Sequence, residues 1–127
     1  MLKNAKVFSS FSVKDIAAAE KFYGETLQLN VVKQPEGLSL ELNGGHNVFI
    51  YPKEDHVPAT FTVLNFIVDD LEIIVDGLSA KGVKFEHYNF GHSGTDEKGI
   101  MRGDRAPKMI AWFKDPEGNF LSVLQQN

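Results

Sequence analysis

The stretch Phe11-Ser12-Val13-Lys14-Asp15-Ile16 has a similar counterpart 55 residues later, Phe66-Ile67-Val68-Asp69-Asp70-Leu71, and this pair is the strongest indication of the fold. Each copy joins a strand-like apolar stretch to an Asp suited to cap the start of a helix. A second match follows in the same order, where Gly45-His46-Asn47-Val48 falls on Glu117-Gly118-Asn119-Phe120 at a shift of 72. Two ordered matches indicate an internal repeat; the alternative is two unrelated strand–helix starts.

The residues around the two copies predict the same order of elements. The first copy lies in a pattern of a strand, a helix and three strands, at 6–13, 16–27, 30–34, 38–42 and 47–51. The second continues as strand 61–68, a helix from Asp70 to about Lys81 with Gly82 after its end, strand 83–90, a long loop 91–105, and strands 108–113 and 119–125. The sequence therefore predicts an α+β fold, a single domain 1–127 with two tandem βαβββ modules, at 6–52 and 61–125, and a linker 53–60.

Composition narrows the classes of function. The chain has 127 residues, 43% of them hydrophobic and 10 of them Phe, which is enough for a core without disulfides, and it has 0 Cys. The formal charge of −4, with 13 basic and 17 acidic residues interspersed, argues against nucleic-acid binding. No signal-peptide pattern and no apolar run of membrane-spanning length is present. We expect a cytoplasmic protein with neither nucleic-acid nor membrane partners.

Three stretches are similar to the motifs of a known superfamily. Phe11–Ile16, followed by Phe22-Tyr23 and Leu27-Gln28-Leu29, resembles its first-module signature, with Gln28 in place of the usual Gly. Val68–Leu71 resembles the start of its second module, and Phe113-Lys114-Asp115-Pro116-Glu117-Gly118-Asn119 its closing motif Phe-x-Asp-Pro-x-Gly-Asn. The chain thus resembles the vicinal oxygen chelate superfamily of glyoxalase I, bleomycin-resistance proteins, extradiol dioxygenases and fosfomycin-resistance enzymes. The resemblance, over residues 6–125, implies paired modules curled around a cavity, usually in a homodimer.

The resemblance also implies where a metal would bind. Metal-using members place His, Glu or Gln on the first and last strand of each module. Counting seven residues from the motif aspartates and applying the shift of 72 puts Phe8, Ile50, Val63 and Ser122 at these positions. None is a competent ligand, and neither neighbour in sequence supplies one. We therefore expect no metal and no other cofactor; His87, His92 and Asp96 are the remaining candidate ligands, and His46 and His56 fit solvated loop residues.

Strand alternation predicts which side chains face the cavity. It assigns Phe8, Ser10 and Ser12 to the cavity face and Phe11 and Val13 to the helix face. The predicted ligand-binding set combines apolar, aromatic and neutral polar groups: Phe8, Ser10, Ile50, Val63, Asn65, Trp112 and Ser122. Such a wall suits a small, partly apolar organic molecule. The alternative is that these side chains fill the cavity as an ordinary core.

Three functions remain open from the sequence. The preferred interpretation is a bleomycin-resistance-like homodimer that binds a small molecule in a metal-free cavity, with no catalytic residue assigned. The rival is a metal-dependent lyase or dioxygenase of the same superfamily with displaced ligands. The third is a module that acts only through protein contacts. The loop 91–105 fits a lid, a dimer-contact arm or a solvated loop.

Overall fold

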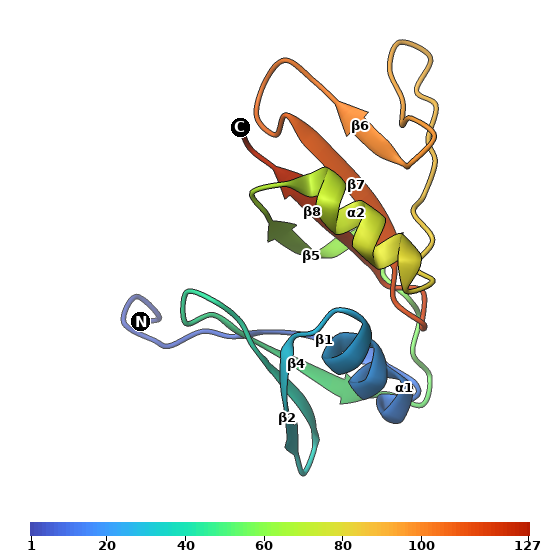
Figure 1. Cartoon of the computed structure of the whole chain (residues 1–127). Helices are drawn as coiled ribbons and strands as arrows, with labels where there is room; N and C mark the ends of the chain where they lie inside the picture. The colour runs from blue at the N-terminus through green and yellow to red at the C-terminus, as the bar shows by residue number, and fades with distance from the viewer. The chain divides into compact units, whose positions relative to one another are not determined.

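The computed structural model describes all residues from 1 to 127, which divide into two compact units, Met1–Pro58 and Ala59–Asn127. Each unit contains a four-stranded mixed sheet and repeats the element order βαβββ (Figure 1). The predicted fold class, α+β with two tandem βαβββ modules, is confirmed. None of the helices is long and apolar enough to cross a membrane.

The first unit consists of β1 (Ser9–Val13), α1 (Ile16–Lys21), a π-helical turn η1 (Phe22–Thr26), β2 (Asn30–Gln34), β3 (Gly37–Glu41) and β4 (Asn47–Pro52). The strand order is β1-β4-β3-β2, with β1 parallel to β4 and the other pairs antiparallel. Asp15 caps α1 as predicted, because its Oδ1 accepts a hydrogen bond from the Ala18 N–H at 3.1 Å.

The second unit consists of β5 (Thr62–Ile67), α2 (Leu71–Ala80), β6 (Ile100–Arg102), β7 (Met109–Lys114) and β8 (Phe120–Gln125). Its strand order, β5-β8-β7-β6, repeats that of the first unit, and β5 is parallel to β8. Asp70 caps α2 through the Ile73 N–H, and Gly82 follows the helix with φ 93°. Both features were predicted from the sequence.

Two predicted elements differ from the structure. The helix expected over 16–27 ends as α1 at Lys21 and continues as η1, in which the Leu27 N–H reaches back to the Phe22 carbonyl. The strand expected over 83–90 is reduced to a bridge between Phe85 and Phe113, and β6 forms instead inside the expected loop 91–105. Asp96 explains β6, because its Oδ1 accepts from the N–H groups of Lys98 and Ile100 and turns the chain back toward β7.

In each unit the helix covers one face of the sheet (Figure 1). The buried apolar side chains lie between the helix and the sheet. The core of the first unit is Val13, Ala19, Tyr23, Leu38, Leu40, Val48 and Ile50. The core of the second is Leu71, Val75, Phe85, Ile100, Ala111, Phe113, Leu121 and Val123. The other face of each sheet has no helix of its own unit, and we call it the open face.

The predicted closing motif forms a turn before β8 whose two ends, Asp115 and Asn119, are buried. Asp115 is 4% exposed, and its carboxylate accepts hydrogen bonds from the N–H of Glu117, the N–H of Asn119 and the Asn119 side-chain amide. The Asn119 Oδ1 in turn accepts from the Ala59 N–H at 3.4 Å. The motif therefore ties the start of the second unit to its last hairpin.

Candidate functional site

The strand register separates the two faces of the first sheet, because directly paired residues share a face. Phe11 pairs with Ile50, and the Phe11 ring lies 6.0 Å from that of Tyr23 in η1, which assigns both to the helix side. Ser10 pairs with Phe49, and Ser12 with Tyr51. The open face of the first unit therefore carries Ser10, Ser12, Phe49 and Tyr51, together with Ser39, the β3 partner of Phe49.

Ile50 is a correction to the predicted site. It is 0% exposed, pairs with Leu38 and lies in the core beneath α1 and η1, so it cannot face Phe8 across an open face. The error comes from the repeat shift. Phe11 and Phe66 are equivalent, and their partners Ile50 and Val123 differ by 73 positions rather than 72. The counterpart of Ser122 is therefore Phe49; the shift of 72 was read from the turns, which differ by one residue.

Phe8 lies next to Phe49 at one end of this open face. Its ring meets that of Phe49 edge to face, at a centroid distance of 6.5 Å, and its side chain is 66% exposed. Both rings line a hollow of about 270 Å³, together with Gln34, Glu36, Ser39, Asn47 and Val48. The first unit thus offers two aromatic rings beside amide and hydroxyl groups and the Glu36 carboxylate, with Phe49 rather than Ile50 next to Phe8.

Ser12 has a partner that the sequence did not predict. Its Oγ lies 2.7 Å from Nδ1 of His56, and Nε2 of the same ring is buried without a hydrogen-bond partner. His56 is therefore not the solvated loop residue expected; it holds the segment after β4 against β1. No periodicity could have shown this, because the contact joins a strand to an irregular segment 44 residues away.

The open face of the second unit carries three of the predicted site residues in one row. Asn65 of β5 pairs with Ser122 of β8, which pairs with Trp112 of β7. Ser122 is 0% exposed, and its hydroxyl donates to the Asn65 Oδ1 at 2.5 Å. Asn65 is exposed and Trp112 is half-buried. The structure thus brings Asn65, Trp112 and Ser122 together.

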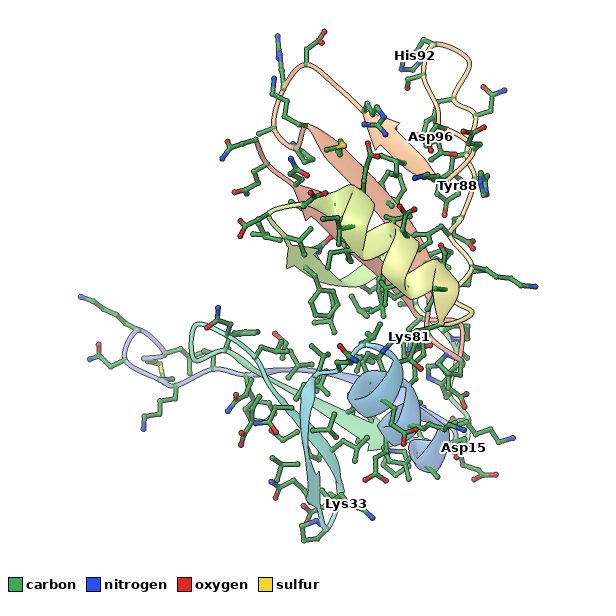
Figure 2. The ribbon with its side chains drawn as sticks, in the orientation of Figure 1. Asp15, Lys33, Lys81, Tyr88, His92 and Asp96 are labelled. Atoms are coloured by element: carbon green, nitrogen blue, oxygen red, sulfur yellow. The ribbon has the colours of Figure 1, made fainter.

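Tyr88 extends this row, although no pattern in the sequence indicated it. The Glu86 N–H donates to the Trp112 carbonyl, so the segment before β6 runs beside β7, and the Tyr88 ring meets that of Trp112 edge to face at 5.5 Å. Partial burial, with the nearby Glu86 carboxylate, raises the Tyr88 pKa above that of a free phenol. Figure 2 shows Tyr88 and Asp96 near each other at this edge of the sheet.

Val63 and Ser10 complete the predicted set. Val63 is half-buried at a bulge of β5, where the register with β8 slips between Thr62 and Leu64. Strict alternation fails at a bulge, so the predicted orientation of Val63 does not follow from the sequence. Ser10 is exposed on the open face of the first unit and is the repeat counterpart of Asn65.

The residues considered as metal ligands are not clustered within either unit. No group of three or more His, Asp or Glu side chains gathers there. Asp96 is engaged by Lys98, Ile100 and Arg102, and His87 contacts the Glu97 carbonyl at 3.1 Å. His92 lies at the tip of its loop, away from Asp96 (Figure 2). The open faces therefore present rings, hydroxyls and amides rather than a set of metal donors.

Solved structures with a similar fold belong to proteins of different functions. The chain superposes on a fosfomycin resistance protein from Listeria monocytogenes with a TM-score of 0.69 at 11% identity, covering 98% of this chain and 94% of the other. It superposes on an antibiotic binding protein from Streptomyces sp. CB03234 with a TM-score of 0.64 at 20% identity, covering 98% of each chain. It superposes on a lactoylglutathione lyase from Agrobacterium tumefaciens with a TM-score of 0.65 at 18% identity, covering 96% of this chain and 93% of the other. At these identities the likeness concerns the fold alone.

Sequence comparison identifies the family. No curated protein matches the chain in sequence. The family model described as Glyoxalase/Bleomycin resistance protein/Dioxygenase superfamily matches residues 8–123. The match covers both units and the motifs that begin and end them. The chain belongs to the glyoxalase/bleomycin resistance protein/dioxygenase superfamily.

Proposed function

We propose that this protein binds a small, planar, partly apolar organic molecule on its open faces and does so without a metal ion. The observation that carries the proposal is the row of Asn65, Ser122, Trp112 and Tyr88, in which a buried hydroxyl and an exposed amide lie beside two aromatic rings. Flat apolar surface next to a few directed polar groups is typical of small-molecule sites.

The chemistry of the strand positions supports binding rather than metal catalysis. Phe8, Phe49 and Ser122 lie where the superfamily resemblance implied metal ligands, and two of them are hydrocarbon rings. A lone neutral hydroxyl does not offset the dehydration of a divalent cation. The similarity to an antibiotic binding protein from Streptomyces agrees with this proposal at the level of the fold.

Trp112 makes the proposal directly testable, because it is the only Trp among the 127 residues. We expect planar bicyclic aromatics, titrated in a buffer containing a chelator, to quench Trp112 fluorescence saturably. A saturated bicyclic ketone of the same size serves as the control for shape and should bind measurably more weakly. Absence of any saturable change would refute binding at this face. Stoichiometric Zn, Ni, Mn or Fe in the purified protein, removed by chelator together with an activity, would favour the rival lyase or dioxygenase.

A further inference from the structure

The hydrogen bond between Ser122 and Asn65 fixes the polarity of the second-unit site. The Ser122 hydroxyl donates to the Asn65 Oδ1 at 2.5 Å, so the carbonyl end of the amide is occupied. The two N–H donors of the Asn65 Nδ2 make no hydrogen bond within the chain, and the side chain is exposed. Asn65 therefore presents two free donors to anything that approaches the open face, while its oxygen already accepts one hydrogen bond.

Two further donors lie along the same row. The indole N–H of Trp112 can only donate, and it has no hydrogen-bond partner in the structure. The hydroxyl of Tyr88, which can donate as well as accept, also has no partner. The remaining acceptors in the row are the second lone pair of the Asn65 Oδ1, the Tyr88 hydroxyl and the oxygen of Ser122, which is 0% exposed. The N–H groups of Asn65 and Trp112, which can only donate, are the groups of the row that require an acceptor from a ligand.

The charged side chain that the strands place on this face is already paired. Lys114 is the charged residue of β5, β7 and β8 on the open face; its Nζ lies 3.6 Å from Glu86 and 4.9 Å from the centre of the Phe120 ring. No unpaired cation therefore adjoins the row to select an anion. Neutral donors beside aromatic rings match a neutral acceptor on a flat molecule.

Resting on the proposed function, we infer that the ligand of the second-unit site is a neutral aromatic molecule that carries an exocyclic hydrogen-bond acceptor such as a carbonyl oxygen, held by the Asn65 amide N–H. The aromatic part lies against Trp112 and Tyr88, and the acceptor reaches the donors of Asn65. This assigns Asn65 as the residue that determines specificity and Ser122 as the residue that positions it.

The test uses two probes of nearly equal shape, 2-acetylnaphthalene and 2-isopropenylnaphthalene, in which a CH₂ group replaces the carbonyl oxygen. Their dissociation constants are measured by Trp112 fluorescence for the wild type, Asn65→Asp and Asn89→Asp. Asn65→Asp removes both N–H donors but keeps an oxygen for Ser122. Asn89→Asp makes the same change at another exposed position of this unit, where the side-chain oxygen accepts from the Gly91 N–H.

We expect Asn65→Asp to raise the dissociation constant of the acetyl probe roughly three- to tenfold, which corresponds to the loss of one hydrogen bond. The dissociation constant of the isopropenyl probe should change little. Asn89→Asp should alter neither probe. Equal effects of Asn65→Asp on both probes would overturn the inference and leave the proposed function intact. If neither probe quenches Trp112 even in the wild type, the proposed function and the inference both fail.

Discussion

Gln28 is the one residue other than Gly with a positive φ, at 59°. It follows η1 at the position where the superfamily signature carries Gly, and the substitution therefore places a side chain in the left-handed region. A non-glycine residue there costs about 1 kcal/mol, because its Cβ crowds the following carbonyl. The departure noted in the sequence is thus a point of backbone strain.

We predict that Gln28→Gly raises the free energy of unfolding by up to about 1 kcal/mol, since relief of strain exceeds the added entropy of the unfolded chain. Gln28→Val should lower it, because a β-branched residue tolerates this conformation poorly. Chemical denaturation measures both. Gln34→Gly is the matched control, in the extended backbone of β2, and should destabilise the protein. A Gly that destabilises equally at both positions would contradict the account of strain.

The site residues show how far strand alternation reaches. It correctly grouped Asn65, Ser122 and Trp112, because alternation is strict where a register is continuous. Ile50 was placed on the wrong face because its position was taken from the repeat shift of 72, whereas the strand partners Ile50 and Val123 are 73 apart. Tyr88 could not be predicted from strand alternation, because its place beside Trp112 depends on a segment that is not a regular strand.

At the scale of elements, β6 depends on a small polar cluster around Asp96. The Asp96 Oδ1 accepts from two backbone N–H groups, and its Oδ2 lies 3.4 Å from Arg102, which also bonds Glu72 of α2 at 2.8 Å. Partial burial alone would raise the Asp96 pKa, but the hydrogen bonds from Ile100, Lys98 and Arg102 outweigh it and hold the pKa below its ordinary value. The cluster therefore connects the segment before β6 to both the helix and the sheet edge.

We predict that Asp96→Ala lowers the free energy of unfolding by about 1–3 kcal/mol at neutral pH, because two N–H groups lose their acceptor. Asp96→Asn keeps an oxygen for them and should cost less. A carboxyl whose pKa is lowered on folding stabilises the protein above its unfolded pKa, near 4, and this stability is lost as the pH falls through the folded pKa. The advantage of the wild type over Asp96→Asn should therefore disappear in acid.

Thermal unfolding as a function of pH measures this difference. Asp104→Ala is the control, because Asp104 is an exposed carboxylate on the next loop whose side chain makes no hydrogen bond. It should change stability by less than about 0.5 kcal/mol. An Asp96→Asn protein whose deficit persists unchanged in acid would show that the charge of Asp96 is not involved.

At the scale of the whole molecule, the repeat determined the fold more reliably than any single element. Two capped helix starts and one turn motif were enough to predict both βαβββ modules, since these signals are local. β6 was missed because it is three residues long and is specified by a side-chain contact rather than by apolar periodicity. The assignment of 6–52, 53–60 and 61–125 as module, linker and module stays a prediction.

We predict that the chain forms a two-fold symmetric homodimer, because each sheet leaves its first strand at an edge and large apolar side chains remain exposed nearby. Ile67, at the end of β5, is 65% exposed, and Phe61, which directly precedes β5, is 68% exposed. Light scattering should give twice the chain mass of 14.2 kDa. Ile67→Lys should weaken the dimer, whereas Ile73→Lys, at an equally exposed position of α2 (66%), should not. A monomeric wild type at micromolar concentration would refute the prediction.

The central claim is that the open face of the second unit binds a small aromatic molecule without a metal. The most direct measurement is a two-dimensional NMR titration of isotope-labelled protein with 2-acetylnaphthalene in the presence of a chelator, followed at the single indole N–H signal, that of Trp112. We expect a progressive, saturable shift of this signal and of the signals of the Asn65 side-chain amide, while the signals of α2 stay in place. An indole signal that does not move at saturating probe, or that moves only after a divalent metal is added, would contradict it.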